Sequence, residues 1–285
     1  MRALSSAFTW ICMVLLIIVW VPLLGLIRLF DRDPVLYRTG RWFRRLGVAM
    51  TYVNPAWDIT VENGDSVADP RLPYVVVSNH LSNADIPLIS RLPWEMKWVG
   101  KKSLFDMPIV GWMMTWAGDI PVDRRDTKSR ANVLKRATWY LKRKCSVIFF
   151  PEGTRSKDGV LLRWADGPFR LAIENGVPIL PLAVDGTRDA LQKNDWKFGV
   201  ADAIRLRVLD PISTDGLTSA DAPELRQRVR RIVGEQLAEW RGVPLADVLG
   251  DQTPLLDADL PAVSVAGIEE DAKPTPHLDG PRRSL

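Results

Sequence analysis

A histidine and an aspartate five residues apart, His80 and Asp85, form the pattern in this chain that is best suited to proton transfer. Imidazole exchanges a proton readily near neutral pH, and a carboxylate in contact with one ring nitrogen fixes the tautomer and stabilises the charged ring. Such pairs serve hydrolysis and acyl transfer. Because a continuous helix would turn these two side chains to different faces, the pair requires a bend. Pro87 predicts one by placing Asp85 at a helix start, with His80 in the preceding loop.

Two later segments carry groups that bind phosphate. Gly118 to Arg124 ends an apolar run with an arginine, and Glu152-Gly153-Thr154-Arg155 offers a carboxylate, a flexible backbone, a hydroxyl and a guanidinium. Guanidinium binds phosphate in bidentate geometry. Each segment alone is equally compatible with a solvated turn bearing a surface arginine. Together with His80, they indicate one site for a phosphate-bearing ligand.

Two buried strands, Tyr74 to Ser78 and Ser146 to Phe150, must position these groups. In α/β sheets, ligands bind beyond the carboxyl ends of the strands, so both segments are expected to converge on one cleft. Strands alternate with helices, which predicts an α/β fold with a mixed central sheet flanked by helices. The other expected strands are Trp57 to Glu62, Trp94 to Gly100, Pro178 to Val184 and Ile204 to Leu209, and the expected helices are Asp85 to Leu92, Ser129 to Arg143, Phe169 to Asn175 and Pro223 to Arg241.

The N-terminal region is expected to embed in a membrane. Ala3 to Ile27 carries no charge over 25 residues, and as a helix it would extend about 37 Å, enough for a hydrocarbon core of ~30 Å. Arginines follow it, which places the protein on the cytoplasmic face of the cell membrane. Pro22 and Gly25 interrupt the run, and the Arg-rich segment Tyr37 to Val53 is typical of an interfacial helix. A true span and a two-helix anchor in one leaflet both remain open.

These features divide the chain into a membrane anchor at 1–55, an α/β domain at 56–245 and a disordered tail at 246–285. The tail contains His277, the only other histidine, so no metal site is expected. Cys12 and Cys145 suggest neither a disulfide framework nor zinc. The net charge of +4 suits anionic lipid, whereas no nucleic-acid motif is present.

Four ordered blocks between about Thr60 and Pro211 resemble those of the glycerolipid acyltransferases, and most of all the bacterial 1-acyl-sn-glycerol-3-phosphate acyltransferase family. The blocks are Asn79-His80-x4-Asp85, Gly118-x-Ile-x-Val-Asp-Arg124, Phe150-Pro-Glu-Gly-Thr-Arg-Ser156 and Val177-Pro-Ile-Leu-Pro-Leu182. The resemblance implies transfer of a fatty acyl group from acyl-CoA or acyl carrier protein to the sn-2 hydroxyl of lysophosphatidic acid, which gives phosphatidic acid. It implies His80 as the general base, Asp85 as its orienting partner and no cofactor besides the acyl donor.

The resemblance also implies where the acceptor binds. Arg124 and Arg155 would hold its phosphate with added charge from Lys101, and Glu152 would contact the glycerol. The implied substrate-binding residues are thus Lys101, Arg124, Glu152, Gly153, Thr154 and Arg155.

One departure from the family leaves the acceptor open. Relatives commonly carry Phe-Lys-x-Gly after the third block, whereas Trp164-Ala165-Asp166-Gly167 lacks the lysine. A different acceptor, such as a lyso-ornithine lipid or lysophosphatidylglycerol, is therefore an alternative, as are thioester hydrolysis and lipid binding without catalysis. The apolar stretch Leu104 to Ala117 is compatible both with an acyl-chain lining and with ordinary core packing.

Overall fold

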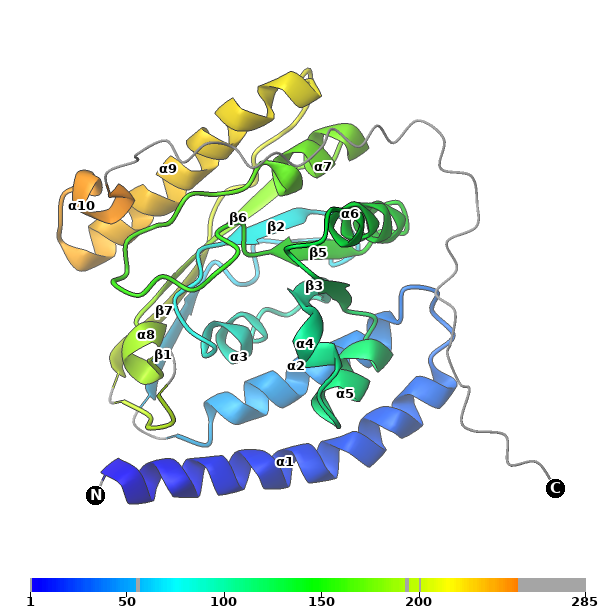
Figure 1. The fold of residues 1–285 in the computed structure, drawn as a ribbon, viewed down its shortest axis with the longest axis vertical. Coiled ribbons are helices and arrows are strands. Elements are labelled where there is room, and N and C mark those ends of the chain that lie inside the picture. Colours follow the sequence, from blue (N-terminus) through cyan, green and yellow to red (C-terminus); the bar gives the residue numbers. More distant parts are fainter. Residues whose placement is uncertain (1, 55–56, 193–194, 200, 251–285) are drawn as a thin grey trace.

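The computed structural model describes residues 2–54, 57–192, 195–199 and 201–250. Its centre is a 7-stranded sheet in the order β1-β7-β6-β2-β5-β3-β4 (Figure 1). Neighbouring strands pair in parallel, except β6 with β7, which pair antiparallel, so the predicted mixed sheet is confirmed. The strands are β1 Trp57–Glu62, β2 Val75–Ser78, β3 Met96–Lys101, β4 Ile120–Val122, β5 Ser146–Phe149, β6 Ile179–Asp185 and β7 Ala201–Val208.

Helices cover both faces of the sheet, and the central strand β2 contributes to two cores. Val75 and Val77 pack with the helices α6, α7 and α9, whereas Val76 packs on the opposite face with Leu88 and Ile89. This division follows from the alternation of side chains along a strand. The described helices are α1 Arg2–Phe30, α2 Tyr37–Thr51, α3 Asp85–Ile89, α4 Lys102–Phe105, α5 Val110–Trp116, α6 Thr127–Leu141, α7 Gly167–Asn175, α8 Thr187–Ala190, the 3-10 turn η1 Ser219–Asp221, α9 Ala222–Arg241 and α10 Leu245–Leu249.

Helix α1 runs unbroken through Pro22, so the expected interruption there is wrong. By length and composition, Ala3–Phe30 could cross a membrane. The helix nevertheless lies along the body of the protein (Figure 1). Near its start, Ser6 Oγ accepts a hydrogen bond of 2.9 Å from the backbone N–H of Phe198. Further along, Trp20 Nε1 donates to the carbonyl of Trp42 at 2.9 Å.

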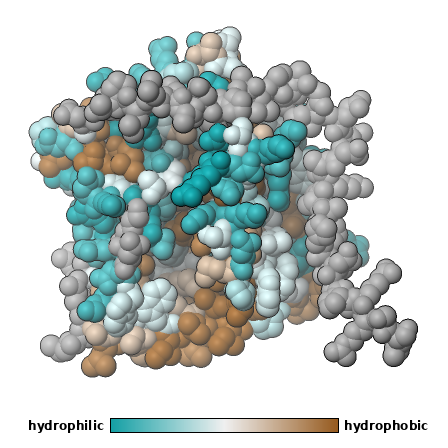
Figure 2. Space-filling view, viewed as in Figure 1, coloured by the Kyte–Doolittle hydropathy of each residue, from teal (hydrophilic) through white to brown (hydrophobic). Residues whose placement is uncertain are grey.

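The side of α1 that faces away from the body is apolar and exposed. In Figure 2 it forms part of the hydrophobic band along the lower edge of the molecule, where Figure 1 places α1. Its exposed side chains include Leu4, Phe8, Ile11, Val14, Leu15, Ile18, Val19, Leu26, Leu29 and Phe30. A continuous apolar surface of this kind is typical of a membrane-interaction site.

Helix α2 lies between α1 and α3 and contacts both. Sequence spacing predicted an interfacial helix, yet Arg44 is buried inside the protein. Gly40 allows α2 to approach the sheet closely, because a Cβ atom there would lie 2.0 Å from Glu95 Oε1. The second helix is therefore built into the α/β body.

The apolar stretch 104–117 divides between core and surface. Met113 and Ala117 are buried, whereas Trp112 is 54% exposed. Trp116 packs against α1, where it would meet a Cβ atom on Gly25 at 3.7 Å. Core packing therefore describes part of this stretch, and a lining for the acyl chain stays a prediction.

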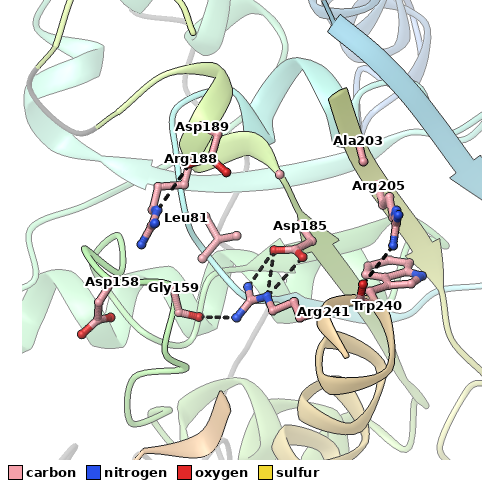
Figure 3. A pocket seen from close by; sticks show the side chains of 11 residues that line it. Leu81, Asp158, Gly159, Asp185, Arg188, Asp189, Ala203, Arg205, Trp240 and Arg241 are labelled. Carbon is pink, nitrogen blue, oxygen red and sulfur yellow. Dashed lines mark hydrogen bonds and ion pairs between the residues drawn. The ribbon is translucent and has the colours of Figure 1, made fainter. Parts of the chain in front are cut away.

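The C-terminal part of the described chain packs on the body. Arg241, at the end of α9, binds the carboxylate of Asp185 at the end of β6 (Figure 3). Residues 246–249 were expected in a disordered tail but belong to α10, where Val248 is buried. Residues 251–285 of the predicted tail, with His277, lie outside the described residues.

Candidate active site

The candidate site lies at the carboxyl edge of the sheet, where β2 ends at Ser78 beside β5 and β6. Asn79 fixes this edge by exchanging two hydrogen bonds with the backbone of Val184: its Nδ2 donates to the carbonyl at 2.8 Å, and its Oδ1 accepts from the N–H at 2.9 Å. The chain after Asn79 is thereby held against the end of β6. His80 begins its loop from a fixed position.

His80 folds back onto Asp85, at the first residue of α3. His80 Nδ1 lies 2.7 Å from Asp85 Oδ2, and the carboxylate is fully buried. Because an ionised carboxylate only accepts hydrogen bonds, this contact assigns the imidazole proton to Nδ1. Nε2 is then left with its lone pair, as a general base requires.

Four donors surround the carboxylate of Asp85. Oδ2 also accepts from the backbone N–H groups of Leu81 at 2.8 Å and Ser82 at 3.0 Å. Oδ1 accepts from the hydroxyl of Thr187 at 2.5 Å. Charge-assisted hydrogen bonds of this kind are about twice as strong as neutral ones. The acid that orients His80 is thus itself held rigidly.

Phe150 and Glu152 support His80 from the segment after β5. The rings of His80 and Phe150 stack with centroids 4.1 Å apart. Glu152 Oε1 accepts from the backbone N–H of His80 at 3.0 Å, and the backbone N–H of Ser156 donates to the carbonyl of His80 at 2.9 Å. The first and third sequence blocks are therefore joined through the histidine.

The position of Glu152 differs from the expected contact with glycerol. Its second carboxylate oxygen accepts from the backbone N–H of Leu162 at 3.3 Å, so both oxygens face the protein, and the side chain is buried. Burial raises the pKa of Glu152 to about 8, although the amides of His80 and Leu162 partly oppose that rise. In this structure Glu152 acts as a support for the His80 loop.

The turn after Glu152 depends on Gly153. Its φ of 68° lies in the left-handed region, which glycine adopts without strain. Thr154 is exposed and Arg155 is partly exposed. The turn therefore places Thr154 and Arg155 at the surface, in the segment that follows β5.

Lys101 and Arg124 lie at or just after the carboxyl ends of the next two strands, β3 and β4. Lys101 is the last residue of β3 and pairs with Val122, the last residue of β4, and Arg124 follows two residues later. Both side chains are exposed. Together with Arg155 after β5, three cations follow three neighbouring strands that lie on one side of His80.

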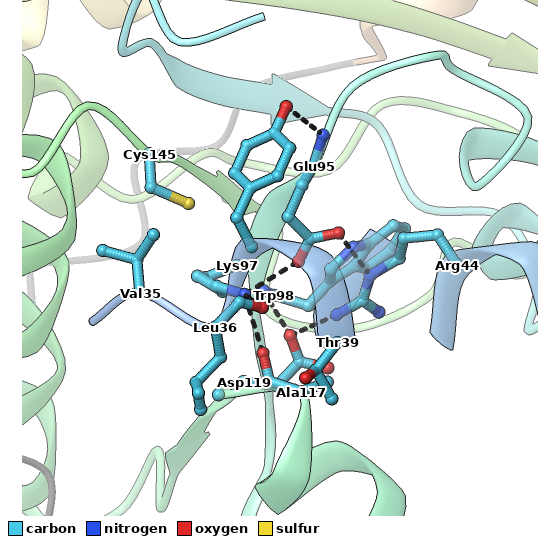
Figure 4. A network of polar contacts seen from close by, with 12 residues as sticks. Val35, Leu36, Thr39, Arg44, Glu95, Lys97, Trp98, Ala117, Asp119 and Cys145 are labelled. Atoms are coloured by element: carbon cyan, nitrogen blue, oxygen red, sulfur yellow. Dashed lines mark hydrogen bonds and ion pairs between the residues drawn. The ribbon is translucent and has the colours of Figure 1, made fainter. Parts of the chain in front are cut away.

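A buried network holds the strands that carry these cations (Figure 4). Lys97 Nζ donates to Glu95 Oε1 at 3.0 Å, and Arg44 Nη2 donates to Asp119 Oδ1 at 2.5 Å. The Arg44 Nε atom also lies 3.6 Å from Glu95 Oε2. Two positive and two negative groups thus tie α2 to β3 and to the start of β4.

Comparisons with known proteins identify the family of this chain. A family model described as Acyltransferase matches residues 58–185. The 1-acyl-sn-glycerol-3-phosphate acyltransferase of Saccharomyces cerevisiae is 30% identical over 76% of this chain and 69% of its own. The chain belongs to the 1-acyl-sn-glycerol-3-phosphate acyltransferase family.

A solved member of this acyltransferase family has the same fold. The chain is similar to the 1-acyl-sn-glycerophosphate acyltransferase PlsC from Thermotoga maritima, with a TM-score of 0.71 and 25% identity over 84% of this chain and 96% of that one. Some relatives are longer. The chloroplastic acyltransferase LPAT1 of Arabidopsis thaliana is 36% identical over 54% of this chain but only 43% of its own length.

Sequence reasoning missed two groups that shape this candidate site. Thr187 lies 102 residues from Asp85, and its hydroxyl is an ordinary feature of a βα turn. Asn79 belongs to the first block, but its partner Val184 is 105 residues away. Only the pairing of β2 with β6 would have indicated either contact.

Proposed function

We propose that this protein transfers a fatty acyl group from a thioester to the sn-2 hydroxyl of 1-acyl-sn-glycerol-3-phosphate, which yields phosphatidic acid. The observation that carries the proposal is the 2.7 Å contact between His80 Nδ1 and Asp85 Oδ2 at the sheet edge. The relatives are named as acyltransferases of 1-acyl-sn-glycerol-3-phosphate, which supports the proposed acceptor.

In the proposed reaction, His80 Nε2 removes the proton of the acceptor hydroxyl while that oxygen attacks the thioester carbonyl carbon. The tetrahedral intermediate then collapses, the carbon–sulfur bond breaks, and the imidazolium returns the proton to the departing thiolate. Asp85 stabilises the imidazolium between these steps. General base catalysis of this kind contributes about 10²–10⁴ in rate.

Direct transfer, without an acyl-enzyme, is the favoured route. A covalent route would need an activated nucleophile beside His80. Burial raises the pKa of Cys145 to about 12, which keeps this thiol protonated and unreactive. Because His80 removes the hydroxyl proton and returns it to the thiolate, the proposed chemistry needs no metal. It needs no cofactor besides the acyl donor, which is acyl-CoA or acyl carrier protein.

The acceptor phosphate is proposed to lie beside the ends of β3, β4 and β5. Lys101, Arg124 and Arg155 follow these strands, and guanidinium groups suit a phosphate dianion. A phosphate held there would leave the glycerol hydroxyl free to approach the histidine after β2. Substrate orientation of this kind accounts for a large share of enzymatic rate enhancement.

The protein is proposed to lie on the cytoplasmic face of the membrane, with α1 embedded in one leaflet. Both halves of α1 are fastened to the body, through Ser6 and Trp20, while its outer side is apolar. A helix crossing the bilayer would leave the body along most of its length. The arginines after α1 favour the cytoplasmic side.

A related acceptor is the second candidate. Ala165, where relatives commonly carry lysine, is exposed, so a lysine there would add a charge at the surface beside the third block. The absence of that charge favours an acceptor with a different headgroup, such as a lyso-ornithine lipid or lysophosphatidylglycerol.

The test is an acyl-transfer assay with purified full-length protein and a panel of lysolipids, using acyl-CoA and acyl carrier protein as donors. We expect the highest kcat/KM with lysophosphatidic acid and a loss of about 10²–10⁴ in the His80→Ala variant. Preference for another lysolipid would reassign the acceptor. Thioester loss that does not require an acceptor would indicate a hydrolase, and binding without turnover would contradict catalysis altogether.

A further inference from the structure

A cavity of about 560 Å³ opens at the carboxyl edge of β6, on the side of β2 opposite to β5 (Figure 3). Its volume lies within the range of about 300–1,000 Å³ that is usual for small-molecule sites. Leu81, the residue after His80, forms part of its wall. The cavity therefore borders the catalytic loop without including the cations proposed for the acceptor phosphate.

The arginines of the cavity differ in how firmly they are bound. Arg241 is fully committed, because Nε and Nη2 bind Asp185 while Nη1 donates to the carbonyl of Gly159 at 2.8 Å. Within the described residues, Arg188 and Arg205 each make one long hydrogen bond of 3.3 Å to a backbone carbonyl. Arg188 also lies 3.8 Å from the exposed carboxylate of Asp189. Both guanidinium groups retain donors for a ligand.

The remaining wall is mixed in character. Leu81, Ala203 and Trp240 provide apolar surface, and three aspartates balance the three arginines. A strongly anionic ligand would need a more basic cavity. A ligand with one phosphate, several amide groups and apolar carbon fits this combination of hydrogen-bonding and apolar surface.

The proposed reaction supplies such a ligand. The acceptor and the donor must both reach His80, and the cations of β3, β4 and β5 are assigned to the acceptor. The acyl group of either donor is attached to a 4′-phosphopantetheine arm, which carries two amides, a dimethyl group and a phosphate. Coenzyme A and acyl carrier protein share this arm.

We propose that the cavity lined by Leu81, Arg188, Arg205 and Trp240 binds the 4′-phosphopantetheine arm of the acyl donor. Arg188 and Arg205 hold its phosphate, and the arm runs past Leu81 so that its sulfur ends beside His80. The two substrates then approach the histidine from opposite sides. This inference rests on the proposed acyl transfer.

Two substitutions of opposite charge at the same residue, Ala203, provide the kinetic test. Ala203 lines the cavity and is exposed, so it accepts larger side chains. We expect Ala203→Glu to raise the KM for acyl-CoA about tenfold, through repulsion of the phosphate, with kcat and the KM for the acceptor unchanged. Ala203→Lys, of similar length and opposite charge, should leave the donor KM unchanged or lower it. The same effect is expected with acyl carrier protein.

The same kinetics can overturn the inference. A rise in the acceptor KM with an unchanged donor KM would assign the cavity to the acceptor. If both variants match the wild type for both substrates, the cavity is not a substrate site. An equal rise in Ala203→Glu and Ala203→Lys would show a steric effect and would contradict the phosphate assignment.

A binding measurement without turnover separates this inference from the proposed function. Calorimetry on the full-length protein in detergent would compare 4′-phosphopantetheine with pantetheine. We expect the phosphate to improve binding about tenfold in the wild type. Arg188→Ala should lose that difference, whereas Arg231→Ala, which removes a side chain that is 68% exposed on α9, should retain it.

The two proposals can then fail separately. A protein that prefers 4′-phosphopantetheine but acylates no lysophosphatidic acid would contradict the proposed acceptor and support the cavity. A protein that acylates lysophosphatidic acid but binds both compounds equally would support the function and overturn the cavity assignment.

Discussion

The hydroxyl of Thr187, at the start of α8, donates to the buried carboxylate of Asp85 at 2.5 Å. This contact joins the loop of His80 to the end of β6, and it leaves Asp85 Oδ2 for the imidazole and two backbone amides. The carboxylate of Asp85 is thus oriented by Thr187, a residue that follows β6 and lies outside the His80 loop. His80 depends on Thr187 through Asp85.

We expect Thr187→Val to lower kcat about tenfold with little change in either KM. The variant preserves the shape of the side chain but removes a hydrogen bond to a charged group, which contributes about 1.5–3 kcal/mol. Steady-state kinetics measure the change in kcat, and thermal unfolding measures the loss of stability that accompanies the lost hydrogen bond. Thr187→Ser retains the hydroxyl and should recover most of kcat. If Thr187→Ser is as impaired as Thr187→Val, the hydroxyl does not orient Asp85.

Arg124→Ala should raise the KM for lysophosphatidic acid about tenfold or more and leave the donor KM unchanged, because a guanidinium–phosphate contact is lost. Arg125→Ala is the matched control, since it removes a neighbouring exposed arginine outside the block. Equal effects of the two substitutions would show general surface charge rather than a phosphate site.

Arg155→Ala should also raise the acceptor KM, and the effect should disappear with a lysolipid that lacks a phosphate. A site built for phosphate gains nothing from Arg155 when the acceptor has no anion to bind. The measurement is KM for paired acceptors with and without the phosphate. An equal loss for both acceptors would assign Arg155 to folding of the turn.

The contribution of Glu152 to the stability of the folded protein should fall as pH rises from about 4.5 to about 8. Burial raises its pKa in the folded state from the ordinary 4.5 to about 8. Between these values the folded protein binds a proton that the unfolded chain has released, so rising pH favours unfolding. Glu152→Gln cannot titrate, and its melting temperature should fall less across this window. Parallel curves for the two proteins would contradict the shifted pKa.

Gly40→Ala should destabilise the fold strongly, by about 3–5 kcal/mol if the ion pairs behind it separate. The new Cβ would lie 2.0 Å from Glu95 Oε1 and 2.7 Å from Lys97 Nζ. Denaturant unfolding measures the loss. Gly25→Ala in α1 is the control, because its Cβ would meet Trp116 at an ordinary 3.7 Å. A Gly40→Ala protein as stable as this control would show that α2 can move aside.

Local sequence pattern was sufficient for six of the seven strands and for the bend at the site, but the three-residue strand β4, which contains Pro121, was not expected. β-branched runs predict β2 and β5 because both are buried on two faces, and Pro87 predicts the start of α3. The interruption predicted at Pro22 is wrong, because a long helix packed on the body of the protein can tolerate the loss of the one hydrogen bond that proline removes.

Contacts between residues far apart in the sequence could not be predicted from local sequence pattern. Arg44 shares its helical spacing with exposed arginines, and its burial becomes evident only from distant partners, Asp119, which is 75 residues away, and Glu95. Glu152 has the residue type expected for binding glycerol, but the amides of His80 and Leu162 occupy its oxygens. The direction of a side chain depends on neighbours that the tertiary fold supplies.

The attachment of α1 along the body has a consequence for how lipids would travel. If α1 lies flat in one leaflet, as proposed, the sheet edge that bears His80 stays at a fixed height relative to the headgroups. Lysolipid would then enter, and diacylated product leave, by sideways diffusion among neighbouring lipids, so neither acyl chain would have to pass through water.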